Sequence, residues 1–212
     1  RYHKELEALY RSLYGSEDML SALEEALYGY YLQRRDVLKQ RDLHAEQYPD
    51  WYRSGENMGM MLYIDNFAGN LKGVRDKLTY LESAQVNYLH LMPFLDTVPE
   101  RSDGGYAVAD FRKVRPDLGN MEDLEALADA CHEKGMRVCM DFVMNHTSED
   151  HQWAKLAQKG NGEYMSRYFF YADPSVPAAY EKTVPQVFPT TAPGNFTWLP
   201  ECRHWVMTTF YP

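Results

Sequence analysis

The stretch Met136–His151, which reads MRVCMDFVMNHTSEDH, carries the strongest structural pattern in the chain. Apolar side chains at Val138, Met140, Phe142 and Met144 alternate with other residues, which is typical of a buried β-strand. Polar, hydrogen-bonding residues follow at once. Because α/β active sites are built from polar groups at the carboxyl ends of strands, the stretch predicts a strand that leads into a site.

The polar residues of this stretch allow more than one interpretation. Asp141 and Asn145 are expected on the strand face opposite the apolar set, and His146 where the strand ends. Asn145 and His146 could instead cap the strand end without any ligand. Residues 145–151 also contain two histidines and two carboxylates, so a metal site is a further alternative. Their spacing does not match the helical two-histidine zinc motif.

A second block, SDGGYAV at residues 102–108, lies upstream and precedes RPDLG at 115–119. Two adjacent glycines let the backbone turn sharply or approach a ligand, and Tyr106 places a flat ring beside them. Asp103 is therefore a candidate site residue. The alternative is a turn in which the Asp103 side chain caps the backbone.

The two blocks, in this order and with a helix-length segment between them, resemble the α-amylase family of glycoside hydrolases, whose members are eight-stranded (β/α) barrels. The doubled glycine before Tyr106 and the segment WVMTTF at 205–210 are similar to the amylosucrase and sucrose hydrolase branch. The resemblance extends from about Trp51 to the last residue, and more loosely through the N-terminal region.

This resemblance implies a donor subsite that binds a glucosyl unit. Asp103 and His146 would hydrogen-bond its hydroxyls, Tyr106 would stack on the ring, and Phe210 would lie against it. Asp141 and Asn145 would support the site. Asn145 ligates calcium in some members of the family. No cofactor is expected. No metal is expected in the loop 66–70, which has too few carboxylates for a hard cation, and a calcium near Asn145 stays open.

The resemblance also implies a retaining mechanism, which needs two carboxyl groups. In the family the nucleophile follows the fourth strand and the acid/base follows the fifth. The chain contains no Arg-x-Met-Asp or Gly-Glu-Ala segment, so no catalytic residue is expected in it, and both carboxylates are expected beyond Pro212. A complete barrel typically needs roughly 250 residues. These 212 residues are therefore expected to be an inactive part of a longer enzyme.

Three regions are expected. Residues 1–50 carry leucines at helical spacings, with Ser16 as the N-cap of a second helix. Residues 51–150 form about the first three βα units of a partial barrel, with strands within 58–65 and 86–94. Residues 151–212 are rich in aromatic residues and prolines and form an irregular insertion after the third strand.

Composition limits the partners. A net charge of -9 argues against nucleic acid and anionic membrane surfaces, and no apolar run reaches a membrane-spanning length. Three cysteines without metal-ligand spacing favour reduced thiols and a cytoplasmic protein. Secretion stays open, because the chain starts at Arg1 and residues that precede it are not excluded.

The function predicted from the resemblance is that of an amylosucrase-like enzyme, which cleaves sucrose, releases fructose and transfers glucose to an α-glucan. A sucrose hydrolase or another α-glucosidase of the family is an alternative. An alternative of a different class is a barrel that has lost catalysis and serves as a binding or assembly module.

Overall fold

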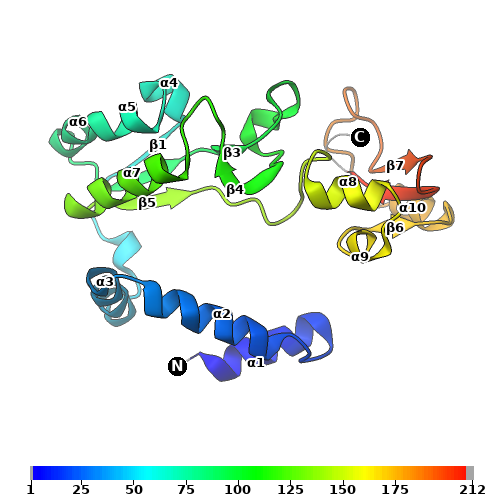
Figure 1. Ribbon diagram of the computed structural model, residues 1–212, viewed down its shortest axis with the longest axis horizontal. Coiled ribbons are helices and arrows are strands. Elements are labelled where there is room, and N and C mark those ends of the chain that lie inside the picture. Colours follow the sequence, from blue (N-terminus) through cyan, green and yellow to red (C-terminus); the bar gives the residue numbers. More distant parts are fainter. Residues whose placement is uncertain (1, 209–212) are drawn as a thin grey trace. The chain divides into compact units, whose positions relative to one another are not determined.

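The computed structural model describes residues 2–208, and the chain divides into two compact units, residues 1–56 and 57–212. In the first unit, the described elements are all helical (Figure 1). They are α1 (His3–Tyr14), α2 (Leu20–Gln33), α3 (Asp36–Gln47) and the short 3-10 helix η1 (Trp51–Arg53).

The expected N-cap at Ser16 is wrong. Gly15 ends α1 in the left-handed region with φ 68°, but α2 begins only at Leu20. The N–H of Leu20 donates to the carbonyl of Glu17, so a separate turn precedes the helix. Met19 takes the N-cap position and makes no side-chain capping bond. The chain thus closes a turn through its backbone where a serine cap was predicted.

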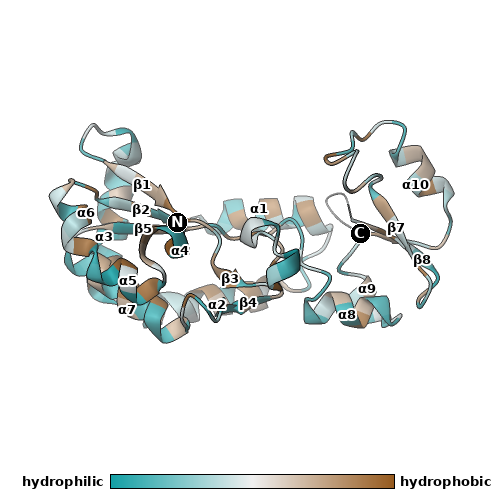
Figure 2. Cartoon of the chain, turned by 90° about the horizontal axis from the view of Figure 1, so that it is seen from above, coloured by the Kyte–Doolittle hydropathy of each residue, from teal (hydrophilic) through white to brown (hydrophobic). Residues whose placement is uncertain are grey.

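The apolar stripes of these helices lie mostly at the surface of the unit. Leu20 is the buried apolar residue among the described residues of this unit, whereas Leu13 is 74% and Tyr30 73% exposed. Figure 2 shows apolar patches along α1 and α2. A small unit has a large surface relative to its volume, so it buries a smaller share of its apolar side chains.

Three parallel strands organise the second unit: β1 (Gly59–Leu62), β2 (Tyr88–Leu91) and β5 (Arg137–Met140), in the order β1-β2-β5. Their carboxyl ends are aligned, since Leu62 pairs with Leu91 and Leu91 with Met140. Helices α4 (Ile64–Ala68), α5 (Leu71–Asp76) and α6 (Leu78–Ser83) connect β1 to β2, and α7 (Met121–Glu133) leads to β5 (Figure 1).

The helices cover one face of this sheet. Leu89 and Leu91 are fully buried and share a core with Leu71, Val74 and Leu127 of the helices. The alternate side chains of β2, including His90, point to the other face and are less buried. Asn120 caps α7 with a capping box that includes Asp123.

The third strand is shorter than expected, because β5 ends at Met140. Phe142 is 54% and Met144 86% exposed, so the alternation beyond Met140 does not form a strand face. Strand β5 loses its pairing partner at this point, because β2 ends at Leu91 and Pro93 has no N–H to donate to a ladder. Residues 141–146 therefore form a loop at the carboxyl edge.

A hairpin follows β2. Strand β3 (Leu95–Asp96) pairs antiparallel with β4 (Asp110–Val114), and between them lie the 3-10 turns η2 (Pro99–Arg101) and η3 (Asp103–Gly105). Its base is firmly anchored in the main core through Phe94, Leu95, Val108 and Val114. The loop that carries Asp103 and Tyr106 therefore starts from a fixed support.

Residues 152–207 form three helices and three strands. The helices are α8 (Gln152–Gln158), α9 (Gly162–Met165) and α10 (Ser175–Tyr180). The strands β6 (Phe170–Tyr171), β7 (Phe196–Leu199) and β8 (His204–Met207) form an antiparallel sheet in the order β6-β8-β7.

Aromatic rings pack within this insertion. The Tyr171 and Phe196 ring centroids lie 5.9 Å apart, and Trp198 and Trp205 lie 5.5 Å apart across the sheet. Phe169 is 65% exposed, so it does not belong to this core. No helix within residues 2–208 has the length and apolar character needed to cross a membrane.

Candidate functional site

The carboxylate of Asp141 is the centre of the candidate site. Asp141 directly follows β5, and its Oδ1 lies 2.9 Å from Nε2 of His90 on β2. Its other oxygen, Oδ2, accepts a hydrogen bond of 3.0 Å from the Tyr106 hydroxyl. One carboxylate therefore ties together two parallel strands and the hairpin loop, at the edge of the sheet where (β/α) barrels place their sites.

The Tyr106 hydroxyl acts as a donor in this arrangement. Burial, and next the hydrogen bond to Asp141, raise the pKa of the Tyr106 phenol. The phenol therefore keeps its proton at neutral pH and continues to donate to Asp141. The ring is held by its polar end, and Tyr106 is only partly buried.

Backbone geometry fixes where this ring begins. Asp103, Gly104 and Gly105 have φ values of 47°, 64° and 98°, all in the left-handed region. Gly105 is buried, and a Cβ there would lie 2.8 Å from both the Cβ and the carbonyl oxygen of Pro93. Only glycine fits at this close approach, which places Tyr106 next to the end of β2.

Asp103 is exposed, and the turn around it is closed by the backbone. Gly105 N–H donates to the carbonyl of Ser102 and Tyr106 N–H to the carbonyl of Asp103, at 2.9 and 3.1 Å. None of the hydrogen bonds found among residues 2–208 uses the Asp103 carboxylate, so the alternative of an Asx cap is not observed. The carboxylate is accessible to a ligand.

Asn145 and His146 lie together in the loop after β5. The Asn145 amide nitrogen, a donor, lies 3.2 Å from Nδ1 of His146. The N–H of Ser148 donates to the carbonyl of Val108 over 2.9 Å. This backbone bond joins the loop that carries His146 to the one that carries Tyr106.

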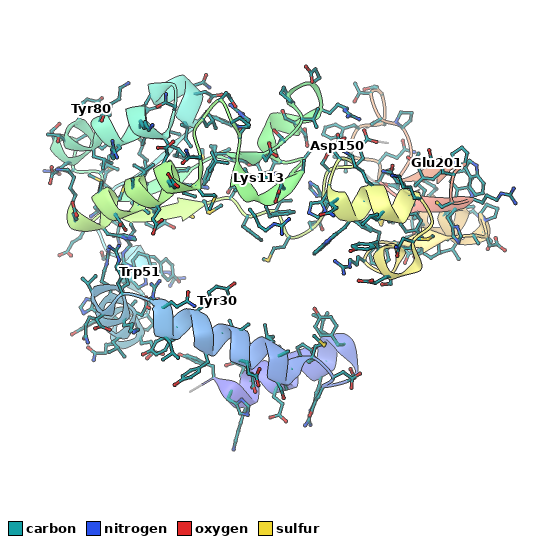
Figure 3. All side chains as sticks on the ribbon, in the orientation of Figure 1. Tyr30, Trp51, Tyr80, Lys113, Asp150 and Glu201 are labelled. Atoms are coloured by element: carbon teal, nitrogen blue, oxygen red, sulfur yellow. The ribbon has the colours of Figure 1, made fainter. Side chains whose placement is uncertain are left out.

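The side chains after His146 are engaged elsewhere. Glu149 and Asp150 form ion pairs with Arg101, the latter at 2.8 Å, and Figure 3 shows Asp150 beside α8. His151 caps α8 by accepting the Trp153 N–H at Nδ1. Among residues 2–208 there is no group of three or more His, Cys, Asp or Glu side chains that could hold a metal ion.

The structure brings several of the candidate residues into contact with one another. Asp141 contacts Tyr106, and Asn145 contacts His146. Asp103 precedes Tyr106 in the same turn. Phe210 lies outside the described residues.

Two neighbours of the site were not assigned from the sequence. His90 lies on β2, and its Nε2 contacts Asp141. Tyr63 directly follows β1, and its hydroxyl lies 3.8 Å from where a Cβ on Gly104 would be. Its position right after a parallel strand was the signal available in the sequence.

The comparison with known families gives the same architecture. The model of the alpha-amylase catalytic domain matches residues 46–208, which is more than half of the chain. The chain belongs to the alpha-amylase family. Its β1-β2-β5 sheet with the connecting helices is accordingly part of a (β/α) barrel.

Relatives within the family differ in role. Trehalose synthase of Pimelobacter sp. is 36% identical over 156 residues, which cover 71% of this chain and 26% of that protein. The human amino acid transporter heavy chain is 32% identical over 158 residues, 70% of this chain and 22% of that protein. The chain therefore spans about a quarter of the length of these curated relatives.

A solved structure of a MutB variant with its substrate sucrose superposes on this chain with a TM-score of 0.60 and 23% identity. The superposed region covers 73% of this chain and 28% of the MutB chain. At this identity the likeness establishes the shared fold alone.

Proposed function

We propose that the complete protein to which these residues belong is an amylosucrase-like retaining glucosyltransferase. It cleaves sucrose through a covalent glucosyl-enzyme intermediate, releases fructose and transfers glucose to an α-glucan. The residues described here form one wall of the subsite for the glucosyl unit. The observation that carries the proposal is the Tyr106 ring, tethered by Asp141 beside the accessible carboxylate of Asp103.

This arrangement suits a sugar ring. A glucosyl unit presents an apolar face to an aromatic ring and hydroxyls around its rim. Tyr106 offers the ring, Asp103 accepts hydrogen bonds from hydroxyls, and His146 donates one through Nε2. Phe210 would complete the wall. Asp141 and Asn145 act on the ligand only through the side chains that they hold.

The choice of sucrose and of transfer rests on the sequence around the site. The Gly104-Gly105-Tyr106 turn and the segment at 205–210 resemble the amylosucrase branch, and MutB, which shares the fold, is described with sucrose as its substrate. Trehalose synthase is a relative as well, so an enzyme acting on another α-glucosyl disaccharide is the nearest alternative. A sucrose hydrolase would use the same donor subsite with water as the acceptor.

A non-catalytic binding or assembly module is the second candidate, and the likeness to a transporter heavy chain favours it. The local geometry favours the enzyme. A module without a sugar site has no need for the strained turn at Asp103 or for the tether on Tyr106, since both features cost conformational freedom.

Product analysis separates these candidates. The complete protein is incubated with sucrose, and the released glucose and fructose are measured over time, with His146→Ala as the matched variant. Fructose well above glucose supports transfer, and equal amounts support hydrolysis. No release from sucrose, combined with turnover of trehalose or maltose, contradicts the sucrose proposal. No turnover of any of these sugars supports the binding module.

A further inference from the structure

His90 lies outside the set of residues expected to contact a sugar, yet it contacts the centre of the site. It sits on β2 between the buried Leu89 and Leu91, and its ring is on the opposite face of the sheet. Its side chain is 30% exposed, and Nε2 is 2.9 Å from Oδ1 of Asp141. The other carboxylate oxygen of Asp141, Oδ2, accepts a hydrogen bond from the Tyr106 hydroxyl.

The strand register explains why Asp141 needs such a contact. The β2–β5 ladder ends with the pair Leu91 and Met140, so Asp141 is the first residue beyond it. Its backbone is no longer held by a strand partner. His90 pairs with Cys139 inside the ladder, two residues before Asp141, and therefore stands on the fixed part of the sheet.

Both carboxylate oxygens of Asp141 are occupied, one by each partner. A carboxylate held at one oxygen can rotate about its side-chain torsions, whereas two donors on opposite sides fix its plane. The position of the oxygen that accepts from Tyr106 is then set by His90. The orientation of the Tyr106 ring depends on that oxygen.

We propose that His90 is a positioning residue for Tyr106 and acts through Asp141. Loss of the imidazole leaves Asp141 Oδ1 without its donor, so the carboxylate turns and the Tyr106 hydroxyl loses a fixed acceptor. The ring then samples more orientations, and stacking on a glucosyl unit weakens. The last step rests on the proposed function of Tyr106, whereas the change in the ring itself does not.

The kinetic test uses the complete enzyme with the variants His90→Leu, His90→Gln, Tyr106→Phe and the double variant His90→Leu/Tyr106→Phe. Glutamine places an N–H donor near the position of Nε2, so it should keep kcat/KM for sucrose within about threefold. Leucine removes the donor and should lower kcat/KM by roughly tenfold, since it leaves a polar atom unsatisfied. The double variant should be no worse than the poorer single variant, because both changes break one chain of contacts.

A second measurement does not require turnover. Fluorine NMR of the protein containing fluorotyrosine identifies the Tyr106 signal as the one missing from Tyr106→Phe. That signal should shift or broaden in His90→Leu and return in His90→Gln. Cys139→Ala is the matched control, because Cys139 pairs with His90 in the ladder, whereas the hydrogen bonds described for the Asp141 carboxylate come from His90 and Tyr106. The signal should stay in place in this variant.

The outcomes are distinct. The positioning role is overturned if the losses of kcat/KM in the two single variants multiply in the double variant. It is also overturned if His90→Gln has a kcat/KM as low as that of His90→Leu. An unchanged Tyr106 signal in His90→Leu overturns it as well. If the signal behaves as expected but the wild-type protein does not turn over sucrose, the positioning role stands and the proposed function fails.

Discussion

Replacing Gly105 by alanine should disturb the turn that places Tyr106. The added Cβ would lie 2.8 Å from the Cβ and from the carbonyl oxygen of Pro93, and the oxygen belongs to backbone that cannot swing aside. Overpacking of this kind costs about 1–3 kcal/mol. A φ of 98° adds about 1–2 kcal/mol for a residue with a side chain. Together these effects should lower the local stability of the loop by about 3 kcal/mol.

Gly104→Ala is the matched control, because it shares the positive φ but not the clash. Its nearest neighbour, the Tyr63 hydroxyl, lies 3.8 Å from the added Cβ, which is an ordinary contact. Only the backbone strain remains, about 1 kcal/mol. The difference between the two variants, about 2 kcal/mol, corresponds to roughly a 30-fold change in the opening equilibrium of the loop.

Native-state hydrogen exchange over residues 102–108 of the complete protein measures this local opening. The amide of Ala107, which donates to the Ser102 carbonyl, is a suitable reporter. Gly105→Ala should exchange much faster than Gly104→Ala. Equal exchange in the two variants would show that the contact with Pro93 does not hold the turn, and the reasoning would fail.

Three further predictions concern stability and reactivity. Burial lowers the pKa of His151, so this histidine binds a proton more readily in the unfolded chain than in the folded one. The free energy of unfolding should therefore fall as the pH drops below about 6.5. Urea titrations of His151→Asn should show a weaker fall. Burial raises the pKa of the Cys131 thiol to about 11, so iodoacetamide at mildly alkaline pH should label Cys131 only after denaturation. Mass spectrometry measures this labelling, with the less buried Cys202 as the comparison. Asn120→Ala removes the capping box of α7 and should lower the free energy of unfolding, measured with denaturant, by about 1 kcal/mol. Asn120→Ser keeps a capping side chain and should lower it by only a few tenths of that. Equal losses in the two variants would argue against the cap.

Local patterns in the sequence predicted the elements that local physics determines. The helical spacing of leucines in residues 1–50 predicted helices there, and the apolar alternation at Val138 and Met140 predicted the strand β5. The end of β5 was predicted too late. The end of β5 depends on where the neighbouring strand β2 stops pairing, near Pro93, and no residue of β5 itself indicates this point.

The candidate site shows the same limit. Asp103, Tyr106 and His146 were predicted from two distinctive motifs, and their role in ligand binding stays a prediction. The contact between Tyr106 and Asp141 joins residues 35 apart, and that between His90 and Asp141 joins residues 51 apart. Such pairings follow from the register of the sheet, which a single sequence does not display.

The most direct test of the central proposal is a crystal structure of the complete protein bound to sucrose, with its acid/base carboxylate replaced by the amide so that the substrate persists. The account predicts a glucosyl ring stacked on Tyr106, with its hydroxyls at hydrogen-bond distance from Asp103 and from Nε2 of His146. Sucrose bound elsewhere, or a glucosyl unit that contacts none of these three side chains, would contradict it.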